Sequence, residues 1–119
     1  MKKTIAVLLV VLLSGCAQKS LYEWGSYSQD LLVYAKNPQA SKDFAEKLRK
    51  NIARAERVGR VPPGMYAEMG YVMVEVGDDR EAVTWFEKER AKWPESATLM
   101  SGLIRRLSAP LPSSTPVTQ

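Results

Sequence analysis

The sequence predicts an all-α protein, a small right-handed solenoid in which about five helices pack one after another. Two observations lead to this fold class. Apolar residues recur at intervals of three and four along most of residues 26–107, which is the spacing of one face of a helix. Proline, in places beside glycine or asparagine, interrupts this pattern at Pro38, at Pro62-Pro63-Gly64 and at Pro94. Each interruption indicates the end of one helix.

The first fifteen residues have the pattern of a secretory signal peptide. Lys2 and Lys3 give a short positive region, and an apolar run from Ile5 to Leu13 follows them. A helix needs about 20 apolar residues to span a bilayer, so this run is too short to be a membrane anchor. We therefore expect residues 1–15 to be removed from the mature chain.

The apolar run ends in Leu-Ser-Gly-Cys16, which resembles the lipobox of bacterial lipoproteins. The resemblance implies that Cys16 becomes the acylated first residue and that residues 16–20 form the lipidated cysteine and a polar spacer. Several acyl chains anchor a protein far more strongly than one chain does. Ala17 stands where aspartate often signals inner-membrane retention, so the resemblance implies the outer membrane. The alternatives are a free buried thiol at Cys16, or cleavage at Ala17 without lipidation.

Charge and composition argue against several function classes. The 119-residue chain has a formal net charge of +4, and removal of Lys2 and Lys3 lowers it to about +2. This gives no reason to expect nucleic-acid binding, which usually requires a clustered basic surface. The chain has no histidine and one cysteine, which lipidation would use, so the commonest catalytic bases, nucleophiles and metal ligands are missing. We therefore expect no enzymatic activity, no metal and no cofactor.

The folded domain is expected to cover residues 21–108, and its first helix is predicted over 26–36. Residues at helical spacing on its inner face are Tyr27, Leu31 and Tyr34. Pro38 disfavours helix at the residue before it. Tyr22 and Trp24 precede the helix and either cover the end of the core or touch lipid headgroups, and core packing is favoured.

The plainest amphipathic helix is predicted over 42–58, with Ser41 as its N-cap. Its apolar face is formed by Phe44, Leu48, Ile52 and Ala55. Its other face is basic and carries Lys47, Arg49, Lys50, Arg54 and Arg57. This basic face either meets anionic headgroups or an acidic partner, or is solvated and pairs locally with Asp43, Glu46 and Glu56, which is favoured. Gly59 is expected to end the helix in the left-handed conformation.

Residues 63–96 resemble a tetratricopeptide repeat, a hairpin of two antiparallel helices. The residues that carry the resemblance are Tyr66, Met69, Gly70, Met73, Ala82, Phe86 and Pro94. Gly70 and Ala82 are small where the two helices must approach closely, and Phe86 fills the space beyond them. The sequence departs from the repeat at Glu89, where a second alanine is common. Tyr66, Met69 and Met73 also replace the usual residues.

The turn of the hairpin and the last helix have their own signals. Asp78 with Glu81 predicts a capping box at the start of the second helix. One hairpin cannot bury its own apolar face, so its neighbours must complete the core. After Ser96, which is expected to cap it, a helix over 97–107 presents a stripe of Leu99, Leu103, Ile104 and Leu107 and closes the array. Residues 109–119, rich in proline, serine and threonine, are expected to be a disordered tail.

Two longer stretches are shared with a family of small bacterial lipoproteins. They are the Leu-Tyr-x-Trp-Gly-x-Tyr opening at residues 21–27 and the Pro-Pro-Gly-x-Tyr-Ala-Glu-x-Gly stretch at residues 62–70. Genes of the family it resembles often neighbour those of a curli-secretion-channel-like lipoprotein and of another small lipoprotein. The resemblance implies an accessory part in a cell-envelope or secretion-complex assembly, with an envelope protein such as that channel-like lipoprotein as partner.

The resemblance to the repeat also implies where a partner would bind. First-helix residues that packing leaves free line the groove of such repeats, and here these are Ala67, Tyr71, Val74 and Glu75. Tyr71 is favoured as the anchor because rigid aromatic side chains are enriched at interface hot spots. The alternative is that a neighbouring helix covers Tyr71. We therefore expect a lipid-anchored protein-binding scaffold, or alternatively a lipoprotein that contacts peptidoglycan or regulates a wall enzyme.

Overall fold

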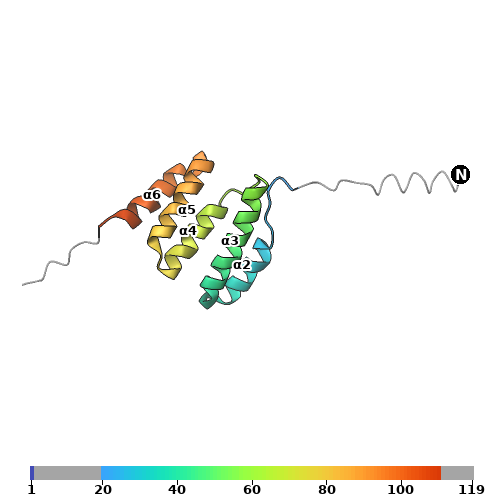
Figure 1. Ribbon diagram of the computed structural model, residues 1–119, viewed down its shortest axis with the longest axis horizontal. Helices are drawn as coiled ribbons and strands as arrows, with labels where there is room; N and C mark the ends of the chain where they lie inside the picture. The colour runs from blue at the N-terminus through green and yellow to red at the C-terminus, as the bar shows by residue number, and fades with distance from the viewer. Residues whose placement is uncertain (2–19, 111–119) are drawn as a thin grey trace, which may run out of the picture.

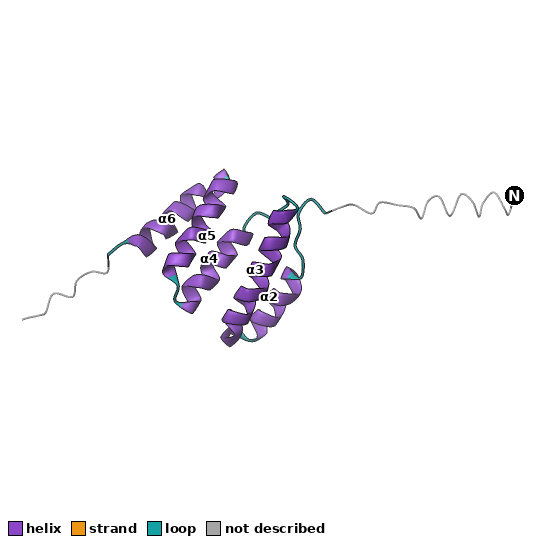
Figure 2. Ribbon diagram, viewed as in Figure 1, coloured by secondary structure: helices purple, strands orange, loops and turns teal. Residues whose placement is uncertain are grey.

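The computed structural model describes Met1 and residues 20–110, and the continuous part folds as α-helices joined by short loops (Figures 1 and 2). The elements in chain order are α2 (Tyr27–Lys36), the 3₁₀ helix η1 (Pro38–Ala40), α3 (Ser41–Arg57), α4 (Met65–Val76), α5 (Asp79–Lys92), the 3₁₀ helix η2 (Pro94–Ser96) and α6 (Ala97–Ser108). No strand occurs between residues 20 and 110, which confirms the predicted all-α class. Residues 2–15 of the predicted signal peptide, Cys16, and residues 111–119 of the predicted tail lie outside the described residues.

The helices are stacked in chain order. α2 packs on α3, α3 on α4, α4 on α5 and α5 on α6, while contacts between helices farther apart in the chain are few. Figure 1 shows this as a row of helices that begins with α2 and ends with α6. Such nearest-neighbour packing is the arrangement of a helical repeat protein, and α6 closes the row as the expected capping helix. The right-handed turn of the array stays a prediction.

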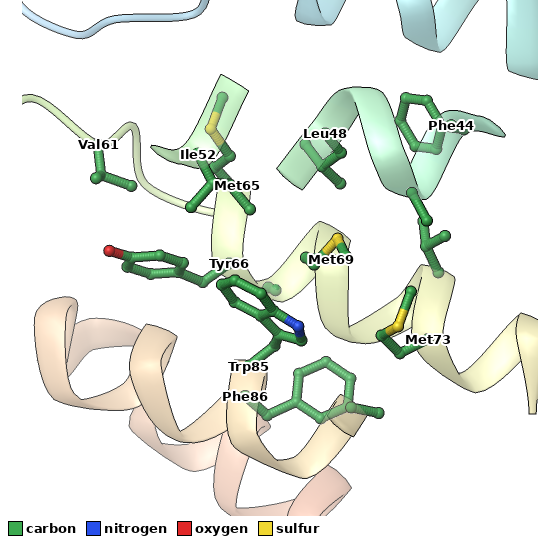
Figure 3. Close-up of a cluster of buried hydrophobic side chains, with 14 of the residues drawn as sticks. Phe44, Leu48, Ile52, Val61, Met65, Tyr66, Met69, Met73, Trp85 and Phe86 are labelled. Carbon is green, nitrogen blue, oxygen red and sulfur yellow. The ribbon is translucent and has the colours of Figure 1, made fainter. Parts of the chain in front are cut away.

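The core lies where α3, α4 and α5 meet (Figure 3). All four residues of the predicted apolar face of α3 are buried: Phe44, Leu48, Ile52 and Ala55. The other two helices contribute Met65, Tyr66, Met69, Val72, Met73, Ala82, Trp85 and Phe86. The middle helix therefore buries residues toward both neighbours, which a repeat of this kind requires.

Gly70 and Phe86 make the closest approach between α4 and α5. A Cβ atom added to Gly70 would overlap the ring of Phe86, which is fully buried. The prediction that Gly70 is small for close helix packing is confirmed. Gly59 has a φ of 65° and its neighbour Arg60 donates its N–H to the carbonyl of Ala55, so the expected left-handed end of α3 is also confirmed.

Of the two serines predicted as N-caps, Ser41 is not the N-cap residue, and Ser96 holds the N-cap position without a side-chain hydrogen bond to α6. Ser41 is the first residue of α3, with helical backbone angles, and Ala40 precedes it without a side-chain cap. Ser96 precedes α6, but its hydroxyl donates to the carbonyl of Trp93 at 2.7 Å and caps nothing in α6. In both places a 3₁₀ turn leads directly into the helix, so its backbone groups are already engaged.

Only one of the two hydrogen bonds of the predicted capping box is formed. The N–H of Glu81 donates to Asp78 Oδ1 at 2.9 Å, as expected for an N-cap. The carboxylate of Glu81 does not return to Asp78, because the N–H of Asp78 already donates to the carbonyl of Met73 at 2.8 Å. Glu81 instead accepts from Trp85 Nε1 at 3.0 Å.

The predicted stripe of α6 is shifted by one residue at its start. Leu99 is exposed, and its neighbour Met100 is buried in the core instead. Leu103, Ile104 and Leu107 pack against the core while staying partly exposed, as the outer helix of an array must. None of the helices between residues 20 and 110 combines the length and the hydropathy that crossing a bilayer requires.

The start of the first helix in each pair is held by a buried side chain of the second helix. Asn51 of α3 accepts the N–H of Ser26, just before α2, at 3.3 Å. Glu89 of α5 accepts the N–H of Gly64, just before α4, at 2.7 Å and that of Ala67 at 3.3 Å. Ser26 and Asn51 are 25 residues apart in the chain, and so are Gly64 and Glu89. The α2–α3 and α4–α5 pairs are therefore two copies of one hairpin arrangement. The N-cap residue of α4 is Gly64, which has no side chain to cap the helix, and Glu89 supplies the hydrogen-bond acceptor instead.

Candidate functional site

The residues predicted to bind a partner do not all lie on one surface. Tyr71 is 43% exposed and Val74 38%, and Glu75 is exposed beside them. Ala67 is only 9% exposed and belongs to the core. It faces inward because the first turn of α4 is held by Glu89 at the junction with α5. The accessible part of the predicted site is therefore formed by Tyr71, Val74 and Glu75.

Tyr71 lies at the edge of the core without being covered by it. Its ring meets the ring of Phe86 edge-on, with centroids 5.3 Å apart and planes at 72°. Neither α3 nor α6 buries Tyr71, since nearly half of the residue stays exposed. A ring fixed on one side and open on the other is well placed to serve as a rigid contact.

Helix α2 brings two further tyrosines to this side of α4. The hydroxyl of Tyr34 donates to Glu75, and this hydrogen bond, with a smaller effect of burial, raises the pKa of Tyr34 to about 12. Burial and the charge of Glu68 raise the pKa of Tyr27 above its usual value. The first helices of both hairpins thus share one surface.

Glu68 is the second carboxylate of this surface. Burial, and then the charge of Glu75, raise the pKa of Glu68 above its ordinary value. Among residues 20–110, neither glutamate forms an ion pair with a lysine or arginine. We call this surface the tyrosine–glutamate face. It is formed by Tyr27, Tyr34, Glu68, Tyr71, Val74 and Glu75.

Three members of the tyrosine–glutamate face are not among the partner-binding residues that the sequence predicts: Tyr27, Tyr34 and Glu68. Glu68 and Glu75 are seven residues apart in one helix and so lie on the same side of it, a spacing that could have been noticed. Tyr34 was assigned to the core of α2. Its ring does stack on Phe44, with centroids 4.7 Å apart, but its hydroxyl reaches Glu75 at the surface. Periodicity alone cannot show that the ring of a tyrosine packs against the core while its hydroxyl forms a hydrogen bond at the surface.

The basic face of α3 lies on another side and is partly neutralised by other helices. Lys47 pairs with Asp30 of α2 at 3.6 Å, and Arg49 with Glu81 of α5 at 2.7 Å. The predicted local pairing within α3 is therefore wrong. Asp43 and Glu46 form no ion pair within the described residues, and the same holds for Lys50, Arg54 and Arg57.

The ion pairs between α3 and α5 surround two stacked aromatic rings. Lys88 lies 3.0 Å from Glu56 Oε1 and 4.7 Å from the centre of the Trp85 ring. Tyr66 stacks on Trp85 at 5.9 Å and donates its hydroxyl to Glu56 at 2.9 Å. Burial would raise the pKa of Glu56, but the hydrogen bonds from Lys88 and Tyr66 outweigh it and the pKa is lowered. These contacts hold the two hairpins together, and the polar groups of Glu56, Tyr66 and Lys88 are engaged with one another.

Two hollows of the described surface differ widely in size. One between α2 and α3 has a volume of about 40 Å³, against ~300–1,000 Å³ for ordinary ligand pockets. A wider one of about 450 Å³ is lined by Asp79, Arg80, Val83, Thr84, Leu107 and Ser108. Within residues 20–110, no group of three or more acidic, cysteine or histidine side chains is placed to hold a metal ion.

Comparison with known proteins gives one match. A family model described as "Domain of unknown function (DUF4810)" matches residues 21–103, which covers the domain from the segment before α2 into α6. No match was found among curated proteins or among solved structures. The match does not bear on lipidation or on a partner.

Proposed function

Because the chain belongs to the DUF4810 family, a domain of unknown function, we propose a role from its own residues: it is a lipid-anchored scaffold that binds an envelope protein. The observation that carries this proposal is the tyrosine–glutamate face. It combines an exposed aromatic ring at Tyr71 with an exposed apolar side chain at Val74 and with Glu68 and Glu75, which form no ion pair with a lysine or arginine among residues 20–110. A surface of this kind suits recognition of another protein better than chemistry on a small substrate.

Anchoring is the second part of the proposal. Cys16 carries the lipid at the outer membrane, on its periplasmic side, and the folded domain acts as an accessory factor in the assembly of an envelope or secretion complex. The lipobox-like Leu-Ser-Gly-Cys sequence and Ala17 support the anchor. The resemblance to lipoproteins encoded beside a curli-secretion-channel-like lipoprotein supports that class of partner.

Tyr71→Ala is expected to lower partner capture roughly thirtyfold, because hot-spot truncations cost about 2 kcal/mol or more of binding free energy. The melting temperature should change little, since Tyr71 is already 43% exposed. Both quantities are measured on the same variant, by crosslinking pull-down from membranes and by thermal unfolding. Leu99→Ala, which truncates an exposed apolar residue on α6, is the matched control and should retain capture.

The opposite result would assign Tyr71 to the core. Truncating a buried aromatic costs about 3–5 kcal/mol of stability. A loss of that size in Tyr71→Ala would rule out the exposed-contact role, and full capture by the variant would remove Tyr71 from the binding surface.

Cys16→Ser is expected to leave an uncleaved precursor without lipid, because the diacylglyceryl group is transferred to a thiol. Metabolic labelling with a radioactive fatty acid should mark the wild-type chain and not the variant. Ser14→Ala keeps the thiol and should still be labelled. Equal labelling of wild type and Cys16→Ser would refute the anchor while leaving partner binding to be judged by the Tyr71 variant.

A further inference from the structure

The continuous part of the structure begins with Ser20, at one end of the domain. Ser20 lies near the C-terminal end of α3, because its carbonyl accepts a hydrogen bond from the guanidinium of Arg60, three residues after that helix, at 3.1 Å. The N–H of Glu23 donates to the carbonyl of Arg60 at 2.8 Å, and the two side chains pair at 3.8 Å. These contacts fix the direction from which any N-terminal tether reaches the domain.

Apolar side chains are exposed at the same end. Leu21 is 73% exposed, and Val58, which follows α3, is 49% exposed. Tyr22 is half-buried and packs edge-on against Trp93 at 5.9 Å, and neither ring is among the core residues or those packed against the core. Trp24 stays exposed beside Tyr27. Amphipathic aromatics of this kind are enriched where proteins meet membrane interfaces.

Cations surround these apolar side chains. Arg57 is exposed in the last turn of α3 and forms no ion pair among residues 20–110. Lys92, in the last turn of α5, lies 5.6 Å from the centre of the Trp93 ring. Of the nearby carboxylates, Glu23 is already paired with Arg60, and Glu95 lies in η2. Glu56 is paired with Lys88 and Glu89 is buried, so among the exposed side chains of residues 20–110 that form no ion pair here, the cations Arg57 and Lys92 outnumber the carboxylate of Glu95.

We propose that this end, formed by Leu21, Tyr22, Trp24, Arg57, Val58, Arg60 and Lys92, rests on an anionic lipid surface. The inference rests on the proposed lipidation of Cys16. Ser20 is four residue steps from Cys16, and fully extended these steps span about 14 Å at most. An anchored chain therefore holds this end close to the headgroups, where exposed apolar side chains and unpaired cations are both favoured.

The placement leaves Tyr71, Val74 and Glu75 of the tyrosine–glutamate face open. These residues lie in the second half of α4, whereas the proposed membrane contact lies where α3 and α5 end. Tyr27, at the start of α2, packs on Trp24 and borders the contact. The domain would stand on the membrane by one end and present Tyr71 to a partner beside it. Arg57 and Lys92, which form no ion pair among residues 20–110, thus acquire a role at this end.

The experiment uses the mature chain from residue 16 with Cys16→Ser, so that no lipid contributes to binding. Flotation is measured with vesicles of phosphatidylglycerol and phosphatidylethanolamine and with vesicles of phosphatidylcholine. We expect binding to the anionic vesicles only, weakened at high salt. Arg57→Gln with Lys92→Gln should weaken it roughly fivefold for each cation removed. Leu21→Ser with Val58→Ser should weaken it as well.

The matched control removes two cations at the other end of the domain. Arg105 and Arg106 occupy the last turn of α6, which runs away from the proposed contact (Figure 1). Arg105→Gln with Arg106→Gln should leave flotation unchanged. Equal losses in both double variants, no flotation with anionic vesicles at low salt, or binding to purified peptidoglycan alone would each overturn the inference. Fatty-acid labelling of Cys16 tests the anchor independently, so the two failures are distinguishable.

Discussion

Gly70→Leu is expected to lower the melting temperature by roughly 15 °C. Even a Cβ at this position would overlap the ring of Phe86, which is fully buried and has no free space to move into. Overpacking of a core costs about 1–3 kcal/mol and occasionally more, and each kcal/mol is worth about 4–8 °C in a domain of this size. Thermal unfolding followed by circular dichroism measures the change.

The fold provides a control on another helical glycine. A Cβ at Gly102 of α6 meets nothing within 4 Å, so Gly102→Leu should be neutral or slightly stabilising. Phe86→Leu should recover part of the stability lost in Gly70→Ala, because the smaller side chain vacates the space that the new methyl needs. An unchanged melting temperature in Gly70→Leu would mean that α4 and α5 do not pack as described.

Glu89→Ala is expected to destabilise the domain by about 2–4 kcal/mol, although alanine is common at this position of the repeat that the sequence resembles. Glu89 is 3% exposed and accepts the N–H groups of Gly64 and Ala67 at the start of α4. Each buried donor left without a partner costs about 1–3 kcal/mol. Urea unfolding measures the loss.

Glu87→Ala is the matched control, because Glu87 is exposed on the same helix and a surface substitution there should stay within about 0.5 kcal/mol. Glu89→Gln should fall between the two, since one amide oxygen still accepts a hydrogen bond. A Glu89→Ala chain as stable as the wild type would show that the buried carboxylate does not cap α4.

Predictions from the sequence were accurate where a residue's environment depends on its own helix. The apolar face of α3 follows from the spacing of Phe44 and Leu48 with the residues beyond them, and both are buried. Leu99 shows the limit of that rule. Its spacing fits the stripe of α6. However, α6 is the outermost helix and packs against only one neighbouring α-helix, and at that contact Met100 is buried in place of Leu99.

The candidate site was predicted in part. The position of Tyr71 in the repeat indicated a residue that core packing leaves free, and it is exposed. The same rule placed Ala67 on that surface and was wrong about its exposure, because α5 covers the first turn of α4. Tyr34 joins the surface only through the approach of α2 to α4, a contact between residues far apart in the chain that no local spacing encodes.

The sequence by itself determined the helical class, the boundaries set by proline and glycine, and the need for a small residue at Gly70. These depend on backbone geometry and on the period of the helix, which are local properties. Only the tertiary structure decided that Asn51 and Glu89 cap the preceding helices, that Arg49 pairs with Glu81, and that the tyrosine–glutamate face stays open. Each of these depends on side chains brought together from different helices, and their distances are fixed by packing.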